Sequence, residues 1–180
     1  MELVPEVLNG LSNSRGGKPL PPVIATGGLS TGAQIAALLT LGASGVALGT
    51  RFLLTPEARY KDTQKAALLA ADGSSTVRTL AFDVARGTLG WPAGINGRAL
   101  KNKTVERFES GENVEDLKQF FQKATLEGDS NGMVVWAGTG VGLVSEIKPA
   151  AVSQTKLSIF ACPGFLILLH RTACRRRTAQ

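Results

Sequence analysis

Two short glycine-containing loops hold the residues of this sequence best suited to binding a phosphate group. They are Thr26-Gly27-Gly28 and Leu48-Gly49-Thr50. Glycine has no Cβ, so a phosphate can approach the backbone and accept hydrogen bonds from its N–H groups, and the Thr50 hydroxyl adds a donor. The pair predicts a phosphate site made by Gly27, Gly28, Leu48, Gly49 and Thr50. The same glycines could instead serve tight turns alone.

Two strand–loop–helix units are predicted to position these loops. Residues 23–25 are short and apolar, as in a buried parallel strand, and residues 44–48 repeat the pattern. A helix follows the first loop, because Thr31 and Gln34 form a capping-box pattern, and it ends at Gly42. A further helix is expected from Thr55 to about Ala71. In closed βα barrels, loops after successive late strands commonly share one phosphate in this way.

The rest of the chain is predicted to mix helices with one irregular region. An apolar stripe at residues 3–11 indicates an opening helix. After Gly73 we expect a strand at 76–82, a loop at 85–102, helices at 103–109 and 114–127, a strand at 133–136 and a short helix ending near residue 148. The expected class is α/β, with late units of a (β/α)₈ barrel and a small, mostly helical insertion.

Length and charge exclude some classes of protein. The chain has 180 residues, fewer than the roughly 250 of a typical complete (β/α)₈ barrel. Its net charge of +6 comes largely from arginines near the C-terminus. The remainder is only mildly basic, and no module that pairs aromatic with basic residues is present. We therefore predict no nucleic-acid partner.

The cysteines and the apolar tail bear on metal binding, compartment and membrane association. Cys162 and Cys174 form no metal-binding pattern, and their low number fits the reducing cytoplasm. Residues 157–169 are strongly apolar, but this stretch is shorter than the roughly 20 residues of a membrane span. No metal and no membrane anchor are predicted. Residues 151–180 are expected to be an atypical tail outside the fold.

Three further groups of residues are candidate sites. Gly138-Thr139-Gly140-Val141-Gly142 resembles a nucleotide fingerprint, but its third glycine comes too early, so a packing turn is favoured. His170 is the single histidine and has no visible partner for acid–base work. Asp83, Arg86 and Trp91 could face a ligand, although a solvated loop with one anchoring aromatic is the favoured interpretation.

Several motifs together resemble the nitronate monooxygenase family, formerly called 2-nitropropane dioxygenases. They are the segments at residues 22–28, 45–52, 55–58, 65–68 and 135–142, of which Gly49-Thr50-Arg51-Phe52 is the most specific. The resemblance implies an FMN-binding (β/α)₈ barrel that oxidises alkyl nitronates with oxygen to carbonyl compounds and nitrite. It assigns the FMN phosphate to Gly27, Gly28, Leu48, Gly49 and Thr50.

The resemblance also implies a domain layout and a gap in the catalytic machinery. Residues 1–74 correspond to the C-terminal portion of the barrel, 75–132 to a smaller domain over the site, and 133–150 to a helix returning to the barrel. The family's catalytic histidine lies in a Gly-Gly-His segment, which this sequence lacks. The chain thus resembles a C-terminal half, and no catalytic residue is assigned.

Two alternatives stay open. Other FMN barrels, such as FMN-dependent enoyl-reductases, share the same phosphate loops. The chain could also be a non-catalytic binding piece, because a half barrel leaves two sheet edges open, and open edges favour self-association.

Overall fold

A computed structural model describes residues 2–153 and the backbone of residues 166–169. The chain divides into two compact units. The first unit contains Met1–Ala58 and Ile147–Gln180, and the second contains Arg59–Glu146. Each unit has its own sheet and its own apolar core.

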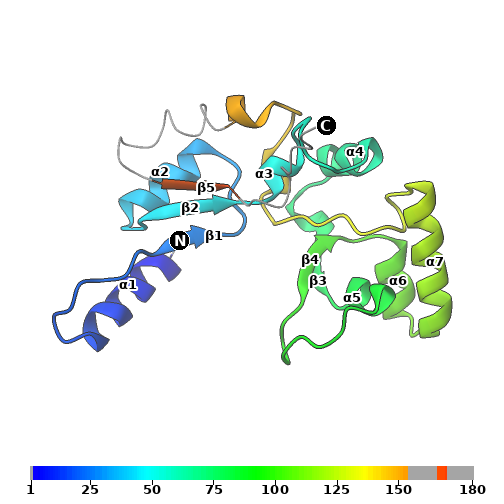
Figure 1. The fold of residues 1–180 in the computed structure, drawn as a ribbon, viewed down its shortest axis with the longest axis horizontal. Helices are drawn as coiled ribbons and strands as arrows, with labels where there is room; N and C mark the ends of the chain where they lie inside the picture. The colour runs from blue at the N-terminus through cyan, green and yellow to red at the C-terminus, as the bar shows by residue number, and fades with distance from the viewer. Residues whose placement is uncertain (1, 154–165, 170–180) are drawn as a thin grey trace, which may run out of the picture. The chain divides into compact units, whose positions relative to one another are not determined.

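The first unit is built on a parallel sheet (Figure 1). Its strands are β1 (Ile24–Thr26), β2 (Gly45–Leu48) and β5 (Leu166–Leu169), in the order β1-β2-β5. Its helices are α1 (Leu3–Ser14), α2 (Gly32–Thr40) and α3 (Thr50–Leu53), with a further helical turn at residues 150–153. The sequence β1-α2-β2 is a βαβ unit, which requires the helix to cross over between two parallel strands.

The predicted capping box explains where α2 begins. The Thr31 hydroxyl accepts from the Gln34 amide, and the Gln34 side-chain oxygen accepts from the Thr31 amide. Gly42, with φ +99°, follows the helix, where a left-handed residue is commonly required. The apolar face of α2 then packs on the sheet, and the buried core consists of Val4, Ala25, Ile35, Leu39, Ala43, Val46 and Leu48.

The second unit combines a two-stranded antiparallel sheet with four helices (Figure 1). In chain order its elements are α4 (Asp62–Ala70), a 3₁₀ turn η1 (Gly73–Ser75), β3 (Thr76–Thr79), α5 (Ala81–Arg86), β4 (Gly97–Leu100), α6 (Lys103–Glu109), α7 (Val114–Glu127) and a 3₁₀ turn η2 (Val141–Leu143). Helices α5, α6 and α7 share one core with β4, formed by Ala81, Phe82, Ala85, Ala99, Val105, Leu117 and Phe121.

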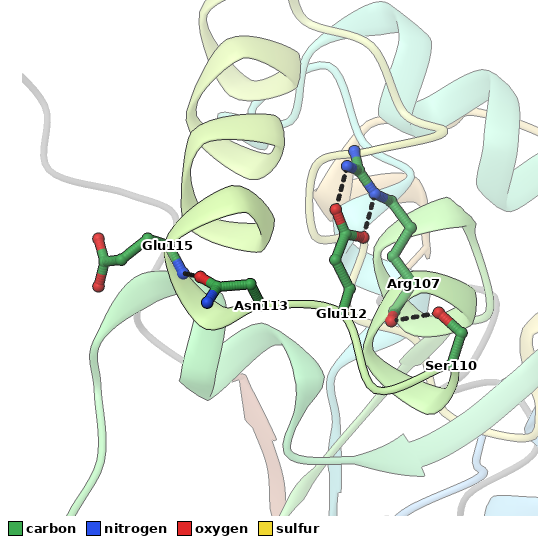
Figure 2. Close-up of polar contacts among 5 residues, drawn as sticks. All are labelled: Arg107, Ser110, Glu112, Asn113 and Glu115. Carbon is green, nitrogen blue, oxygen red and sulfur yellow. Dashed lines mark hydrogen bonds and ion pairs between the residues drawn. The ribbon is translucent and has the colours of Figure 1, made fainter.

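Polar contacts fix the turn between α6 and α7 (Figure 2). Arg107 donates through two nitrogens to the Glu112 carboxylate, and this carboxylate raises the pKa of the Arg107 guanidinium. Ser110 Oγ donates to the Arg107 carbonyl at 2.7 Å, and Asn113 Oδ1 accepts from the Glu115 amide at 2.8 Å. The Asn113 contact is an N-cap, so α7 begins where its first free amide finds an acceptor.

The helix expected from Thr55 to Ala71 begins later than predicted. Thr55 is not an N-cap, because its hydroxyl donates back to the Phe52 carbonyl at 3.1 Å, one residue before the end of α3. Glu57 accepts from the Ala150 amide and so holds the returning chain. Helix α4 starts only at Asp62, where Gln64 Oε1 accepts from the Lys61 amide at 3.0 Å.

The region from residue 76 to residue 102 also differs from the prediction. The strand stops at Thr79, because the Thr79 hydroxyl accepts a hydrogen bond from the Ala81 amide at 3.0 Å. Helix α5 starts at Ala81, and Gly87, with φ +68°, ends it. The predicted loop contains β4, which pairs with β3 in the register Thr76↔Leu100. The residues Gly, Arg, Ala and Leu have little intrinsic preference for a β-strand. This segment is a strand because it pairs with β3 and packs in the core.

The short helix expected after Gly142 is absent from the described residues, where η2 is a single 3₁₀ turn. Within the predicted tail, residues 166–169 form β5. The chain is therefore α/β, as predicted. The two compact units of the structure meet at residues 58/59 and 146/147. The boundaries predicted at residues 74 and 132 are those of the family's domains, and they stay predictions.

Candidate phosphate-binding site

The ends of β1 and β2 lie side by side. The strands run parallel, with Thr26 opposite Ala47. The Thr26 hydroxyl donates to the Ala47 carbonyl at 3.1 Å, which ties the last residue of β1 to its neighbour. The two loops predicted to hold a phosphate therefore both leave the sheet at the carboxyl ends of its strands, which is where ligands bind in open α/β sheets.

The first loop needs its glycines for its shape. Gly27 has φ +94° and Gly28 has φ +69°, a region that residues with a Cβ rarely adopt. A Cβ built on Gly27 meets no atom within 4 Å, so this turn is also open. The turn requirement alone accounts for the residue type at both positions.

The capping box of α2 uses two backbone amides that lie between the glycine turn and the start of the helix. The amides of Ser30 and Thr31 both donate to Gln34 Oε1, at 2.9 and 3.1 Å, and Gln34 Nε2 donates to the Gly28 carbonyl at 3.3 Å. Within the described part of the chain, no protein acceptor is recorded for the amides of Gly28 and Leu29. The donors left for an anion therefore lie at the glycine turn itself.

The second loop gives stronger evidence for a bound ligand than the first loop does. Gly49 has φ −105°, which any residue can adopt, and a Cβ built on it meets no atom within 4 Å. Neither backbone conformation nor protein packing requires glycine at this position. Leu48, with 1% of its surface exposed, belongs to the core, so it can offer a ligand only its backbone. Open space beside Gly49 fits a group that must approach the backbone.

Helix α3 begins at Thr50, the last residue of this loop, and continues with Arg51. Sequence reasoning did not single out Arg51, although it lies in the most specific motif of the family resemblance. Its side chain is only 7% exposed, and its Nη2 donates to Ser153 Oγ at 2.8 Å. Arg51 is therefore a buried basic residue one position after the loop in the chain. This donor set suits a phosphate.

The remaining sequence candidates fall into three groups. Asp83, Arg86 and Trp91 line one cavity of the second unit. The Gly138–Gly142 segment packs closely, since a Cβ on Gly142 would lie 3.0 Å from Asp72 Cα, which agrees with the favoured packing turn. His170, Cys162 and Cys174 lie outside the described residues. Among the residues that are described, no group of three His, Cys, Asp or Glu side chains could hold a metal ion.

Parallel strands with glycine loops at one edge and a capped helix behind them are the architecture of phosphate-binding α/β proteins. The sequence profile of the nitronate monooxygenase family matches residues 1–153. The chain therefore belongs to the nitronate monooxygenase family, as the motifs indicated. No helix in the described ranges is long and apolar enough to cross a membrane.

Relatives and solved structures agree with this family. The chain is 41% identical over 157 residues to the nitronate monooxygenase npaC of Metarhizium robertsii, a match that covers 83% of this chain and 43% of the relative. It is 32% identical over 152 residues to the nitronate monooxygenase of Neurospora crassa, which covers 83% of this chain and 40% of the relative. The chain thus spans less than half the length of these relatives.

Among solved structures, nitroalkane oxidase from Streptomyces ansochromogenes matches with a TM-score of 0.67 and 28% identity, over 91% of this chain and 43% of that one. FabK from Thermotoga maritima matches with a TM-score of 0.64 and 27% identity, over 88% of this chain and 47% of that one.

Proposed function

We propose that the paired loops after β1 and β2 bind FMN by its phosphate. The observation that carries this proposal is Gly49, a glycine that neither its φ of −105° nor any neighbouring atom requires. The backbone donors come from Gly27, Gly28, Leu48 and Gly49, and the Thr50 hydroxyl adds one more. The buried Arg51 follows the second loop directly in the chain and is proposed to add positive charge to the site.

The proposed activity is that of the family: oxidation of alkyl nitronates by molecular oxygen to carbonyl compounds and nitrite. Bound FMN supplies the redox chemistry, and the residues of this chain hold its phosphate and so orient it. Residues 75–132 are proposed to form the smaller domain over the flavin in a (β/α)₈ barrel. No residue of the chain is assigned as a catalytic base, because the sequence contains no Gly-Gly-His segment.

A second candidate function is a binding piece without catalytic activity. The described sheet of the first unit has three strands, with β1 at one edge and β5 at the other. Exposed strand edges pair readily with other strands, so this piece would self-associate. A third candidate keeps the FMN site but reduces an enoyl substrate. A cytoplasmic location and the lack of a nucleic-acid partner stay predictions from composition.

One preparation tests these candidates. The chain is expressed and purified, and its flavin absorbance, oligomeric state and oxygen uptake with ethyl nitronate are measured. Bound flavin with nitronate-dependent uptake supports the monooxygenase. Bound flavin without uptake supports an FMN-binding piece, or an enoyl-reductase if an enoyl thioester is reduced instead. A colourless, self-associated product that does not take up added FMN contradicts the flavin proposal.

A further inference from the structure

The second unit contains a cavity that lies entirely within it. Its volume is about 290 Å³, and it opens between α5 and the loop that leads to β4. Asp83 and Arg86 from α5 line one side. Trp91, Ile95 and Asn96 come from the loop, and Trp136 closes the cavity. Three of the six lining side chains are aromatic or apolar and three are polar, so the cavity combines apolar walls with polar groups, as small-molecule sites do.

Trp136 forms a fixed aromatic wall of this cavity. Its amide donates to Tyr60 Oη at 2.9 Å, and its indole meets the Phe82 ring edge-on, with centroids 5.9 Å apart. The indole also lies directly on Gly97, because a Cβ built there would come within 2.4 Å of Trp136 Cζ3. Contacts to the backbone, to an aromatic edge and to a glycine hold the ring in one orientation before any ligand arrives.

Trp91 and Ile95 leave apolar surface uncovered at the same cavity. Trp91 is 60% exposed and Ile95 is 49% exposed. An indole is among the largest apolar groups a protein can bury, so a planar ligand that covers it removes substantial surface from water. Placed against Trp136 and Trp91, an aromatic ring gains stacking as well as burial.

The polar side chains of this cavity include one cation, Arg86, and one carboxylate, Asp83, which differ in exposure. The Arg86 guanidinium is exposed and has no recorded partner within the residues described. Asn96 Oδ1 accepts from Arg78 Nε at 2.8 Å, so its amide nitrogen is the group left to donate. Asp83 is buried and accepts from the Thr88 hydroxyl at 3.1 Å. One cation and one amide donor therefore remain for a ligand.

We propose that this cavity binds a small aromatic carboxylate, with its ring between Trp91 and Trp136 and its carboxylate on Arg86. Guanidinium and carboxylate match in a planar, two-hydrogen-bond arrangement. The volume of about 290 Å³ is at the small end for ligand pockets and suits one or two fused rings. Every lining residue of this cavity belongs to the second unit, whereas the residues of the proposed flavin site belong to the first.

The two tryptophans make the proposal directly testable, because Trp91 and Trp136 are the only ones in the chain. Their indole N–H signals in a nitrogen-15 NMR spectrum therefore report this cavity and nothing else. Titration with 2-naphthoate is expected to shift both signals to saturation. The neutral analogue 2-naphthamide is expected to bind about tenfold more weakly, since it loses the charge-assisted hydrogen bonds.

Three variants separate the roles of charge and ring. Arg86→Gln is expected to raise the Kd of 2-naphthoate about tenfold and leave that of 2-naphthamide unchanged. Arg59→Gln removes one exposed positive charge elsewhere in the same unit and should change neither. Trp91→Leu should weaken both ligands, with the Trp136 signal as reporter. The remaining amide signals show whether each variant is folded.

Three results overturn the proposal. The first is an absence of saturable shifts with 2-naphthoate in the folded chain. The second is equal binding of 2-naphthoate and 2-naphthamide, and the third is equal effects of Arg86→Gln and Arg59→Gln. Either of the last two shows that the carboxylate is not held by Arg86.

Discussion

The hydroxyl of Thr26 donates to the carbonyl of Ala47 at 3.1 Å, across the parallel pair of β1 and β2. This contact fixes the spacing between the two loops proposed to share one phosphate. Thr26→Val keeps the size of the side chain and removes the donor, so it should lower stability by about 0.5–1 kcal/mol and weaken FMN binding. Thr26→Ser keeps the donor and should bind FMN as the parent does. Urea unfolding and flavin titration check both, and equal FMN affinity in the two variants would contradict the role of this contact.

The two glycine loops should respond differently to alanine. Gly27→Ala places a Cβ at φ +94° and should cost about 1–2 kcal/mol of stability. Gly49→Ala at φ −105° meets no atom within 4 Å and should change stability by less than about 0.5 kcal/mol. Thermal or urea unfolding measures both. A large loss at Gly49 would mean that the protein itself requires this glycine.

Local sequence patterns predicted the first unit well because its signals are local. The capping box of Thr31 and Gln34 lies within four residues, and a glycine, Gly27 or Gly49, directly follows each of the strands β1 and β2. The family motifs likewise pointed to the two loops that the structure brings to one sheet edge. In this unit, neighbouring residues were enough to indicate α1, β1, α2 and β2, whereas α3 and β5 were not predicted.

Where the prediction failed, distant contacts decide the structure. β4 is a strand because it pairs with β3, and nothing in the sequence from Gly97 to Leu100 reports that partner. Thr55 has the sequence of an N-cap, but no helix starts there, and the adjacent Glu57 accepts from the amide of Ala150, which is distant in the sequence. The cavity that joins Asp83, Arg86 and Trp91 to Trp136 also depends on chain folding, since Trp136 is far away in the sequence.

Gly97 should be intolerant of any side chain. A Cβ there would lie 2.4 Å from Trp136 Cζ3, and a shift of the indole would disturb its edge-on contact with Phe82. Gly97→Ala should therefore cost about 1–3 kcal/mol through overpacking. Gly10→Ala is the matched control: it lies in α1 with open space around it and should stabilise by about 0.5–1 kcal/mol. Losses of equal size in both variants would contradict this packing.

Tyr60 should make stability depend on pH in alkaline solution. Burial is the main cause that raises the pKa of its phenol from 10.0 to about 12, while its hydrogen bond with the Trp136 backbone acts in the opposite direction. The folded state thus holds the proton more tightly than the unfolded state does. The stabilisation is complete below about pH 10 and is lost towards pH 12, by up to roughly 2 kcal/mol.

Tyr60 is the only tyrosine, so phenolate absorbance titrates this group alone. A midpoint near 12 is expected in the folded chain. Tyr60→Phe should remove this part of the alkaline loss and cost about 1 kcal/mol at neutral pH, since the Trp136 amide loses its acceptor. A midpoint at the ordinary value of 10.0 would contradict the burial of the phenol.

The central claim is that the loops at Gly27-Gly28 and Gly49-Thr50 hold a flavin by its phosphate, and the most direct measurement compares FMN with riboflavin. Flavin fluorescence is titrated with the purified chain, with Gly49→Leu and with Gly10→Leu as a control at another open glycine. We predict that FMN binds, that riboflavin binds at least about tenfold more weakly, and that only Gly49→Leu abolishes the difference while staying folded. Equal affinities for FMN and riboflavin, or an unchanged preference for FMN in Gly49→Leu, would contradict the account.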